Sequence, residues 1–142
     1  MTETTDKEKQ EEEMQKKYLE LQLIGKQIKQ GQKQLEGLDE QLESIAGLIS
    51  QLDELKETKP GDEMLSPIGE GIFIKGTLRE NSHLIVNVGA NVAVEKTIDE
   101  TKELLREKLA LGQKHRMQMI EELEGMIEQA KGSEKELSSM ME

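Results

Sequence analysis

The sequence has no cysteine and no tryptophan, and Tyr18 and Phe73 are its only aromatic residues. Without cysteine the chain cannot form disulfides, thiolate metal sites or a cysteine nucleophile. A compact domain normally buries several aromatic side chains, because each removes a large area from water. With 34% hydrophobic and 35% charged residues, the composition therefore predicts a thin core between extended elements and not a globular interior.

Basic residues are the minority among the charges: 19 Lys and Arg stand against 30 Asp and Glu, a net charge of −11. Nucleic-acid binding requires clustered Lys and Arg, so this balance argues against it. No apolar run approaches the roughly 20 residues that span a bilayer. The polar, acidic residues 1–13 do not fit a signal or transit peptide. We expect a soluble, cytoplasmic protein.

Two long segments carry a heptad pattern. With position a at Met14, every a and d position of the first segment is apolar except Lys17 and Gly31. The second segment, after Thr97, is less strict. A 3.5-residue repeat predicts supercoiled helices, and a chain that leaves on one helix and returns on another favours an antiparallel coiled coil. The a and d positions are Met14, Lys17, Leu21, Ile24, Ile28, Gly31, Leu35, Leu38, Leu42, Ile45, Ile49 and Leu52, then Ile98, Lys102, Leu105, Leu109, Gly112, Arg116, Met119, Leu123, Met126, Ala130, Ser133, Leu137 and Met140.

Capping and breaking residues set the expected ends of the helices. Thr5 followed by Glu8 fits a capping box, so the first helix is predicted to begin near residue 6 and to run to about residue 56. Pro60 and Gly61 stop it. Thr97, with Glu100 three residues later, is predicted to open a second helix that extends to about residue 140.

Between residues 64 and 96 the apolar period changes to two, which is typical of half-buried strands. Turn residues at 67–71, 79–83 and 89–91 divide the segment into two β-hairpins. Two hairpins do not make a stable barrel alone, and unpaired edges favour partners, so subunits are expected to assemble here. The strand residues expected in this assembly are Ile72, Ile74, Leu78, Leu84, Val86, Val88, Val92 and Val94.

The predicted fold class is α+β, dominated by a long antiparallel helical coiled coil. Its expected parts are an N-terminal helix (1–57), two β-hairpins forming an oligomerisation platform (58–96) and a C-terminal helix (97–142). The e and g positions far from the strands are largely Gln, so we expect helix pairing to be set by the covalent connection and not by charge. Leu48 and Leu55, near the strands, widen the apolar stripe and are expected to pack against the sheet.

No catalytic, cofactor-binding or metal-binding pattern is present. Gly69, Gly71 and Gly76 have the wrong spacing for a dinucleotide loop, and turns explain them. His83 and His115 have no companion at ligand spacing. We therefore expect no enzymatic activity and no cofactor.

Methionines gather near the C-terminus, where five of the eight fall in the last 26 residues. Those at seam positions are explained by core packing, whereas Met117 and Met141 lie off the seam. Flexible Met surfaces suit the binding of many unlike apolar partners. If the helices pair antiparallel, a client-binding tip is expected, formed by Met14, Tyr18, Leu19, Leu137, Met140 and Met141.

Seven glycines also fall within the predicted helices, and only Gly31 and Gly112 lie on the seam. The other five indicate either helices that bend and fray or neutral substitution on an exposed face.

The central segment resembles archaeal prefoldin alpha subunits. The resemblance rests on residues 65–76 (LSPIGEGIFIKG) and 85–95 (IVNVGANVAVE), which are similar to the family's Pro-φ-Gly-x-Gly and Val-Gly-x-Gly-x-x-φ-Glu motifs. Asn91 stands where Gly is usual, but Asn tolerates the left-handed conformation. Ser66 stands where Val or Ile is common.

The resemblance implies an ATP-independent chaperone of two alpha and four beta subunits. In that family the hairpins form a double β-barrel platform, and the coiled-coil tips capture unfolded client proteins and pass them to a group II chaperonin. Two other functions stay open: a structural coiled-coil adaptor, and a prefoldin-like subunit that polymerises through its strands. Neither would require binding to unfolded chains.

Overall fold

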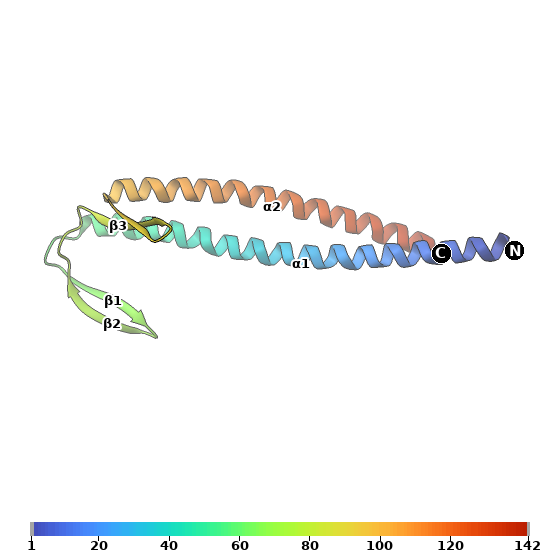
Figure 1. Ribbon diagram of the computed structural model, residues 1–142, viewed down its shortest axis with the longest axis horizontal. Helices are drawn as coiled ribbons and strands as arrows, with labels where there is room; N and C mark the ends of the chain where they lie inside the picture. The colour runs from blue at the N-terminus through green and yellow to red at the C-terminus, as the bar shows by residue number, and fades with distance from the viewer. Residues whose placement is uncertain (1, 142) are drawn as a thin grey trace. The chain divides into compact units, whose positions relative to one another are not determined.

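The computed structural model describes residues 2–141 of the chain, and the side chains of residues 5–141. In the order of the sequence, two antiparallel hairpins lie between two long helices, as the sequence predicted. Met1 and Glu142, which the expected parts 1–57 and 97–142 include, lie outside the described residues. The elements are α1 (Thr2–Glu57), β1 (Glu63–Gly69), β2 (Ile72–Thr77), β3 (Leu84–Gly89), β4 (Val92–Lys96) and α2 (Ile98–Met141), drawn in Figure 1.

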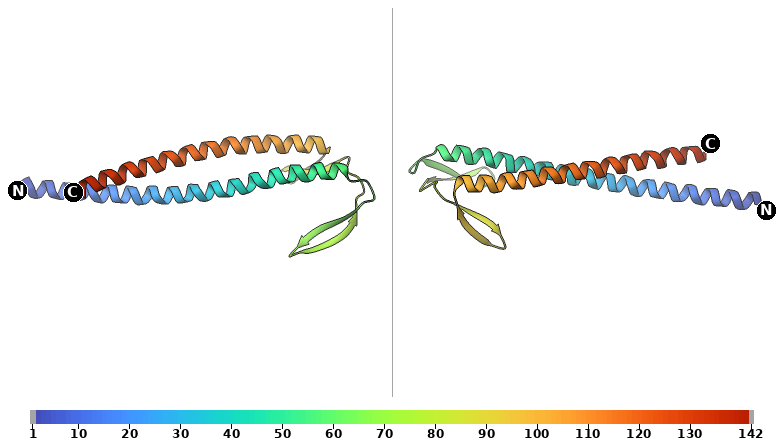
Figure 2. Two further views of the ribbon diagram at one scale, coloured as in Figure 1. Left: turned by 180° about the vertical axis from the view of Figure 1, so that it is seen from behind. Right: turned by 90° about the horizontal axis from the view of Figure 1, so that it is seen from above.

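The chain divides into two compact units. We call residues 1–40 with 113–142 the arm unit, and residues 41–112 the root unit. Within each unit the segments of α1 and α2 lie side by side and run in opposite directions (Figures 1 and 2). Every predicted a and d position is buried or half-buried, which confirms the heptad register of both helices.

Leucine side chains fill the space over the two seam glycines. In the arm unit a Cβ built on Gly31 would lie 3.3 Å from Cγ of Leu123, and in the root unit a Cβ on Gly112 would lie 3.6 Å from Cγ of Leu42, with a methyl group closer still in both cases. Close packing therefore explains these two glycines. The other helical glycines face open space: Gly25, Gly37, Gly47, Gly125 and Gly132.

This difference predicts opposite effects of alanine on the stability of the helices. Gly37→Ala should raise the free energy of unfolding by about 1 kcal/mol, because alanine has the higher helix propensity and its methyl group meets nothing. Gly31→Ala should lower it, because the new methyl group displaces Leu123 from the seam. Guanidinium unfolding followed by circular dichroism measures both. An equal gain from the two substitutions would contradict the seam packing.

Each hairpin turns through two residues with positive φ. Glu70 and Gly71 have φ of 50° and 74°, and Ala90 and Asn91 have φ of 50° and 60°. Two-residue turns with this geometry match the twist of the flanking strands. The register of both ladders shifts just before the turn, between residues 67 and 69 and between residues 87 and 89. Asn91 thus adopts the left-handed conformation, which Asn tolerates.

The β3–β4 hairpin packs on the core of the root unit. Leu52, Ile98 and Leu105 form that core, and Leu84 of β3 and Leu55 of α1 pack against it. Leu55 thus shares this core with Leu84 of β3, whereas Leu48, for which the same packing was expected, is 42% exposed. In contrast, every residue of β1 and β2 is exposed in the single chain, although the sequence predicted half-buried strands. Their alternating pattern does not correspond to burial within this chain.

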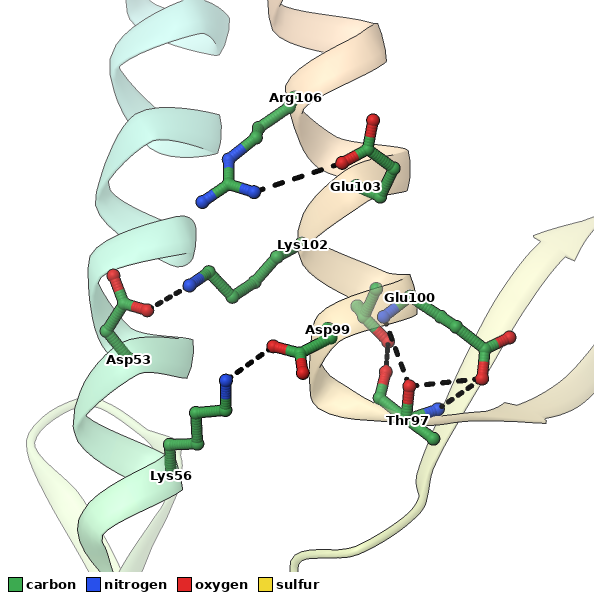
Figure 3. Close-up of polar contacts among 9 residues, drawn as sticks. Asp53, Lys56, Thr97, Asp99, Glu100, Lys102, Glu103 and Arg106 are labelled. Carbon is green, nitrogen blue, oxygen red and sulfur yellow. Dashed lines mark hydrogen bonds and ion pairs between the residues drawn. The ribbon is translucent and has the colours of Figure 1, made fainter.

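The predicted capping box opens α2. The Thr97 hydroxyl accepts a hydrogen bond from the Glu100 amide at 3.1 Å, and the Glu100 carboxylate accepts from the Thr97 amide at 3.4 Å (Figure 3). At the other helix, the predicted start near residue 6 is wrong, because α1 already begins at Thr2. Lys, Glu and Gln in residues 7–13 are good helix formers, and they carry the helix past the expected cap.

A side chain far along the sequence caps the C-terminal end of α1. The Asn81 amide nitrogen donates to the carbonyl oxygens of Leu55 at 3.0 Å and Thr58 at 2.8 Å. The Leu55 carbonyl also accepts from the amide and the hydroxyl of Thr58, at 3.2 and 2.6 Å, so Asn81 and Thr58 together supply donors to the end of the helix. Asn81 lies between β2 and β3, and it ties that connection to the end of α1.

Candidate functional site

The beginning of α1 and the end of α2 form an apolar groove in the arm unit. The groove has a volume of about 480 Å³. Tyr18 is 54% exposed, Leu19 63% and Met141 72%, so large apolar side chains face solvent. We call this surface the tip groove, and it is lined by Met14, Gln15, Tyr18, Leu19, Leu137 and Met141.

Five of the six residues predicted for the tip line this groove together. The exception is Met140, which occupies a half-buried seam position and does not line it. Gln15, which the sequence did not single out, contributes the one polar lining side chain. It lies one residue after Met14 and three before Tyr18, so helical spacing places it on the same face.

Cations on the seam pair with carboxylates of the opposite helix. In the arm unit Lys17 pairs with Glu136, and Arg116 pairs with Asp39 at 2.5 Å. Ion pairs thus join the two helices, while the expectation that the covalent connection sets their pairing stays a prediction. Several other e and g positions hold glutamine, so the sequence pattern did not draw attention to Asp39 and Glu136. Their partners become evident only when the two helices are aligned.

The root unit carries the same kind of pair. Lys102, at seam position a, is buried and contacts the carboxylate of Asp53, while Lys56 contacts Asp99 at 2.5 Å (Figure 3). The Lys102 ammonium holds the pKa of Asp53 below its usual range, chiefly through the hydrogen bond that it donates. Lys56 lowers the pKa of Asp99 in the same way.

The lowered pKa of Asp53 predicts a pH-dependent contribution to stability. The pair stabilises the fold above the pKa of an unfolded Asp, and the effect is lost as the pH falls through the lower folded pKa. Asp53→Asn should therefore lower the thermal midpoint at neutral pH, and its difference from wild type should shrink below about pH 4. Melting curves between neutral and acidic pH test this. Glu54→Gln, at the exposed neighbour, should leave the midpoint unchanged at neutral pH.

The strand residues predicted for subunit assembly lie in the two hairpins of the root unit. Of these, Ile72 and Ile74 on β2 and Val92 on β4 are more than half exposed, and so is Ile85 on β3, which was not predicted. Leu78 is a correction, because β2 ends at Thr77 and Leu78 lies one residue beyond it. Its backbone still continues the pairing: its amide donates to the Asp62 carbonyl at 2.8 Å. The remaining predicted residues, Leu84, Val86, Val88 and Val94, lie on β3 and β4.

Comparison with models of protein families identifies the family of this chain. The model described as prefoldin subunit matches residues 24–141, which include both hairpins and most of both helices. The chain belongs to the prefoldin subunit family. The resemblance that the two hairpin motifs carried is confirmed.

Curated relatives are archaeal prefoldin alpha subunits. The chain is 32% identical over 89 residues to prefoldin subunit alpha of Methanococcus aeolicus, covering 63% of this chain and 60% of the relative. It is 36% identical over 69 residues to that of Pyrococcus horikoshii, covering 49% and 45% respectively. The chain thus matches less than two thirds of the length of either relative.

A solved structure shares the fold. The cryo-EM structure of filamentous PFD from Methanocaldococcus jannaschii aligns with a TM-score of 0.73 and 16% identity, covering 81% of this chain and 95% of that one. The likeness supports the prefoldin arrangement of long helices around two small hairpins.

The part of the chain that the structure describes has neither a cluster of metal ligands nor a helix that could span a membrane. The side chains of residues 5–141 include no group of three or more His, Cys, Asp or Glu placed to hold a metal ion. Over the same residues, neither helix of this prefoldin subunit has an apolar stretch that could cross a membrane.

Proposed function

We propose that this prefoldin subunit is an ATP-independent holdase that binds unfolded client proteins at the tip groove. The observation that supports this most strongly is the groove itself, where Tyr18, Leu19 and Met141 expose apolar surface at the ends of two paired helices. A soluble chain seldom leaves such a surface open without a binding role. The flexible thioether of Met141 can adapt to apolar segments of different shape.

Binding by several subunits at once compensates for the weak hold of each groove. One groove of this size covers only a few side chains of a client, so a single contact is short-lived. Several tips around one client raise the local concentration of binding sites, and avidity follows without a nucleotide. Release then needs only the separate dissociation of weak contacts.

The partners in this proposal are beta-type prefoldin subunits, unfolded clients and a group II chaperonin, in the cytoplasm. The exposed strands β1 and β2 support the first of these, because a two-stranded sheet with two free edges is marginal alone. Two alpha subunits with four beta subunits is the stoichiometry proposed. The archaeal alpha relatives support the remaining parts by analogy.

Light scattering tests the holdase function. A denatured test protein is diluted into buffer with the full chain and its beta-type partner, and aggregation is compared with that in the presence of a chain lacking residues 1–20 and 128–142. The proposal expects the truncated assembly to keep its mass and to lose suppression of aggregation. If both assemblies suppress aggregation equally, the tip groove is not the client-binding site. If neither suppresses aggregation, a structural adaptor is favoured.

A filament-forming subunit is the second candidate. The match in fold to filamentous PFD from Methanocaldococcus jannaschii favours it, as do the exposed hairpin strands. Native mass spectrometry separates the two candidates. A single hexamer mass with beta subunits supports the holdase assembly, whereas a ladder of sizes from the chain alone supports polymerisation through the strands.

A further inference from the structure

On α1, glutamates lie beside the residues that line the tip groove, on the same face of the helix. The α1 residues that line the groove outside the seam occupy heptad positions b, e and f. One heptad earlier the same three positions hold exposed glutamates, and residues one heptad apart lie on the same face of the helix. The corresponding residues are Gln15 and Glu8, Tyr18 and Glu11, and Leu19 and Glu12.

The groove side of α2 shows the same order. Met141 lines the groove at position e, and the e position one heptad earlier holds Glu134, which is exposed. Tyr18 is also an e residue, so the e positions of the two helices border the same side of the arm unit. Carboxylates of Glu11 and Glu134 therefore flank the exposed Tyr18 and Met141 along that side.

On α2 the basic residues near the tip are Lys131 at position b and Lys135 at position f, whereas on α1 they lie away from the groove positions. Lys7, Lys9 and Lys16 occupy positions a and c, and no Lys or Arg stands at b, e or f of α1 between residues 5 and 25. Lys17 is held by the carboxylate of Glu136. Within the described residues, no cation of the chain pairs with Glu11, Glu12 or Glu134. On its α1 side the groove thus presents apolar surface beside an acidic border, to which Glu134 of α2 adds one carboxylate.

We propose that the tip groove selects apolar client segments that carry Lys or Arg about three residues from the apolar anchor. This inference rests on the proposed holdase function. Glu11 precedes Tyr18 by one heptad, which is about 10 Å along the helix. An extended client chain covers that distance in about three residues. Acidic segments of equal hydrophobicity are repelled from the same groove.

Selection of this kind follows from the weakness of each apolar contact. A shallow, open groove cannot distinguish one apolar side chain from another by shape. Charges at its border are exposed, so each adds a modest attraction that salt screens. The preference should therefore be several-fold, and it should depend on ionic strength, whereas the apolar contact itself does not.

Fluorescence anisotropy with short peptides tests the inference. The peptides share a Leu-Phe-Leu anchor and carry Lys, Gln or Glu three residues to either side. Against the full chain assembled with its beta-type partner, the Lys peptide should bind about five-fold more tightly than the Gln peptide at low salt. The Glu peptide should bind most weakly, and the differences should vanish at about 0.5 M salt.

Two triple variants locate the effect. Glu11→Gln with Glu12→Gln and Glu134→Gln should remove the preference and leave the affinity for the Gln peptide unchanged. As a matched control, Glu36→Gln with Glu40→Gln and Glu128→Gln removes the same charge from other exposed positions of the arm unit and should keep the preference.

The outcomes distinguish this inference from the holdase function. If wild type binds the three peptides equally well, the charge selection is wrong while the apolar groove keeps its function. Loss of the preference in the control variant would likewise overturn it, because the effect would then come from net charge. If no peptide binds at any salt concentration, the proposed function and the inference fail together.

Discussion

Replacing Leu19 and Met141 with glutamine should reduce suppression of aggregation at least ten-fold, as judged by the concentration of assembly required. The two side chains are 63% and 72% exposed, so the substitutions should not disturb the seam. Burial of a Leu or Met side chain contributes about 2 kcal/mol. The loss of two such contacts at each tip should weaken client binding by more than binding through several tips can compensate. Light scattering with a denatured test protein gives the measurement.

The chain offers a matched control for this variant. Leu111 and Met117 are again one leucine and one methionine, 75% and 65% exposed on α2. They do not line the tip groove. Leu111→Gln with Met117→Gln should therefore keep full suppression. If the two double variants lose activity equally, clients are held along the helices and not at the tip groove.

Lysines on β2 should prevent the chain from joining an assembly. Ile72 and Ile74 lie on the same face of the strand and are both more than half exposed in the single chain. If a partner subunit covers them, Ile72→Lys with Ile74→Lys buries two charges without partners, at a cost of several kcal/mol. Native mass spectrometry with the beta-type partner should show monomer in place of a hexamer.

The fold of the single chain should survive those substitutions. The core of the root unit is formed by Leu52, Ile98 and Leu105, and β2 does not contribute to it. Helix content by circular dichroism should therefore match that of wild type. Glu70→Lys with Glu80→Lys places two lysines outside β2, in the turn and in the connection to β3, and should still assemble. A normal hexamer from the β2 variant would refute the role of this strand.

Local patterns were sufficient to predict most of this fold. The heptad positions identified every buried or half-buried seam residue, because a single helix face repeats along the sequence. The Thr97 cap and the turn at Asn91 were also predicted, since both depend on neighbouring residues and on the conformations that they accept. At the tip, the seam register brought Met14 and Leu137 together with the exposed Tyr18, Leu19 and Met141.

Contacts between distant residues were not predictable in this way. Asn81 caps α1 across 26 residues of sequence, and a turn residue gives no sign of such a contact. The pairing of Arg116 with Asp39 depends on how the two helices are aligned, which neither helix encodes alone. Gln15 was missed because a polar residue does not contribute to an apolar pattern. The charge border of the tip groove likewise appears only when both helices are considered.

The cations of the seam also disfavour pairing of the two helices in a shifted register. In the native register Arg116 pairs with Asp39, and Lys102 pairs with Asp53. A shift of α1 by one heptad would bring Gln32 or Ala46 to Arg116, and Ala46 or Pro60 to Lys102. Either shift leaves both cations opposite a residue that is not a carboxylate. A helix from a neighbouring subunit would face the same penalty unless it offered carboxylates at the same spacing, so the two cations favour pairing of α1 with α2 of the same chain.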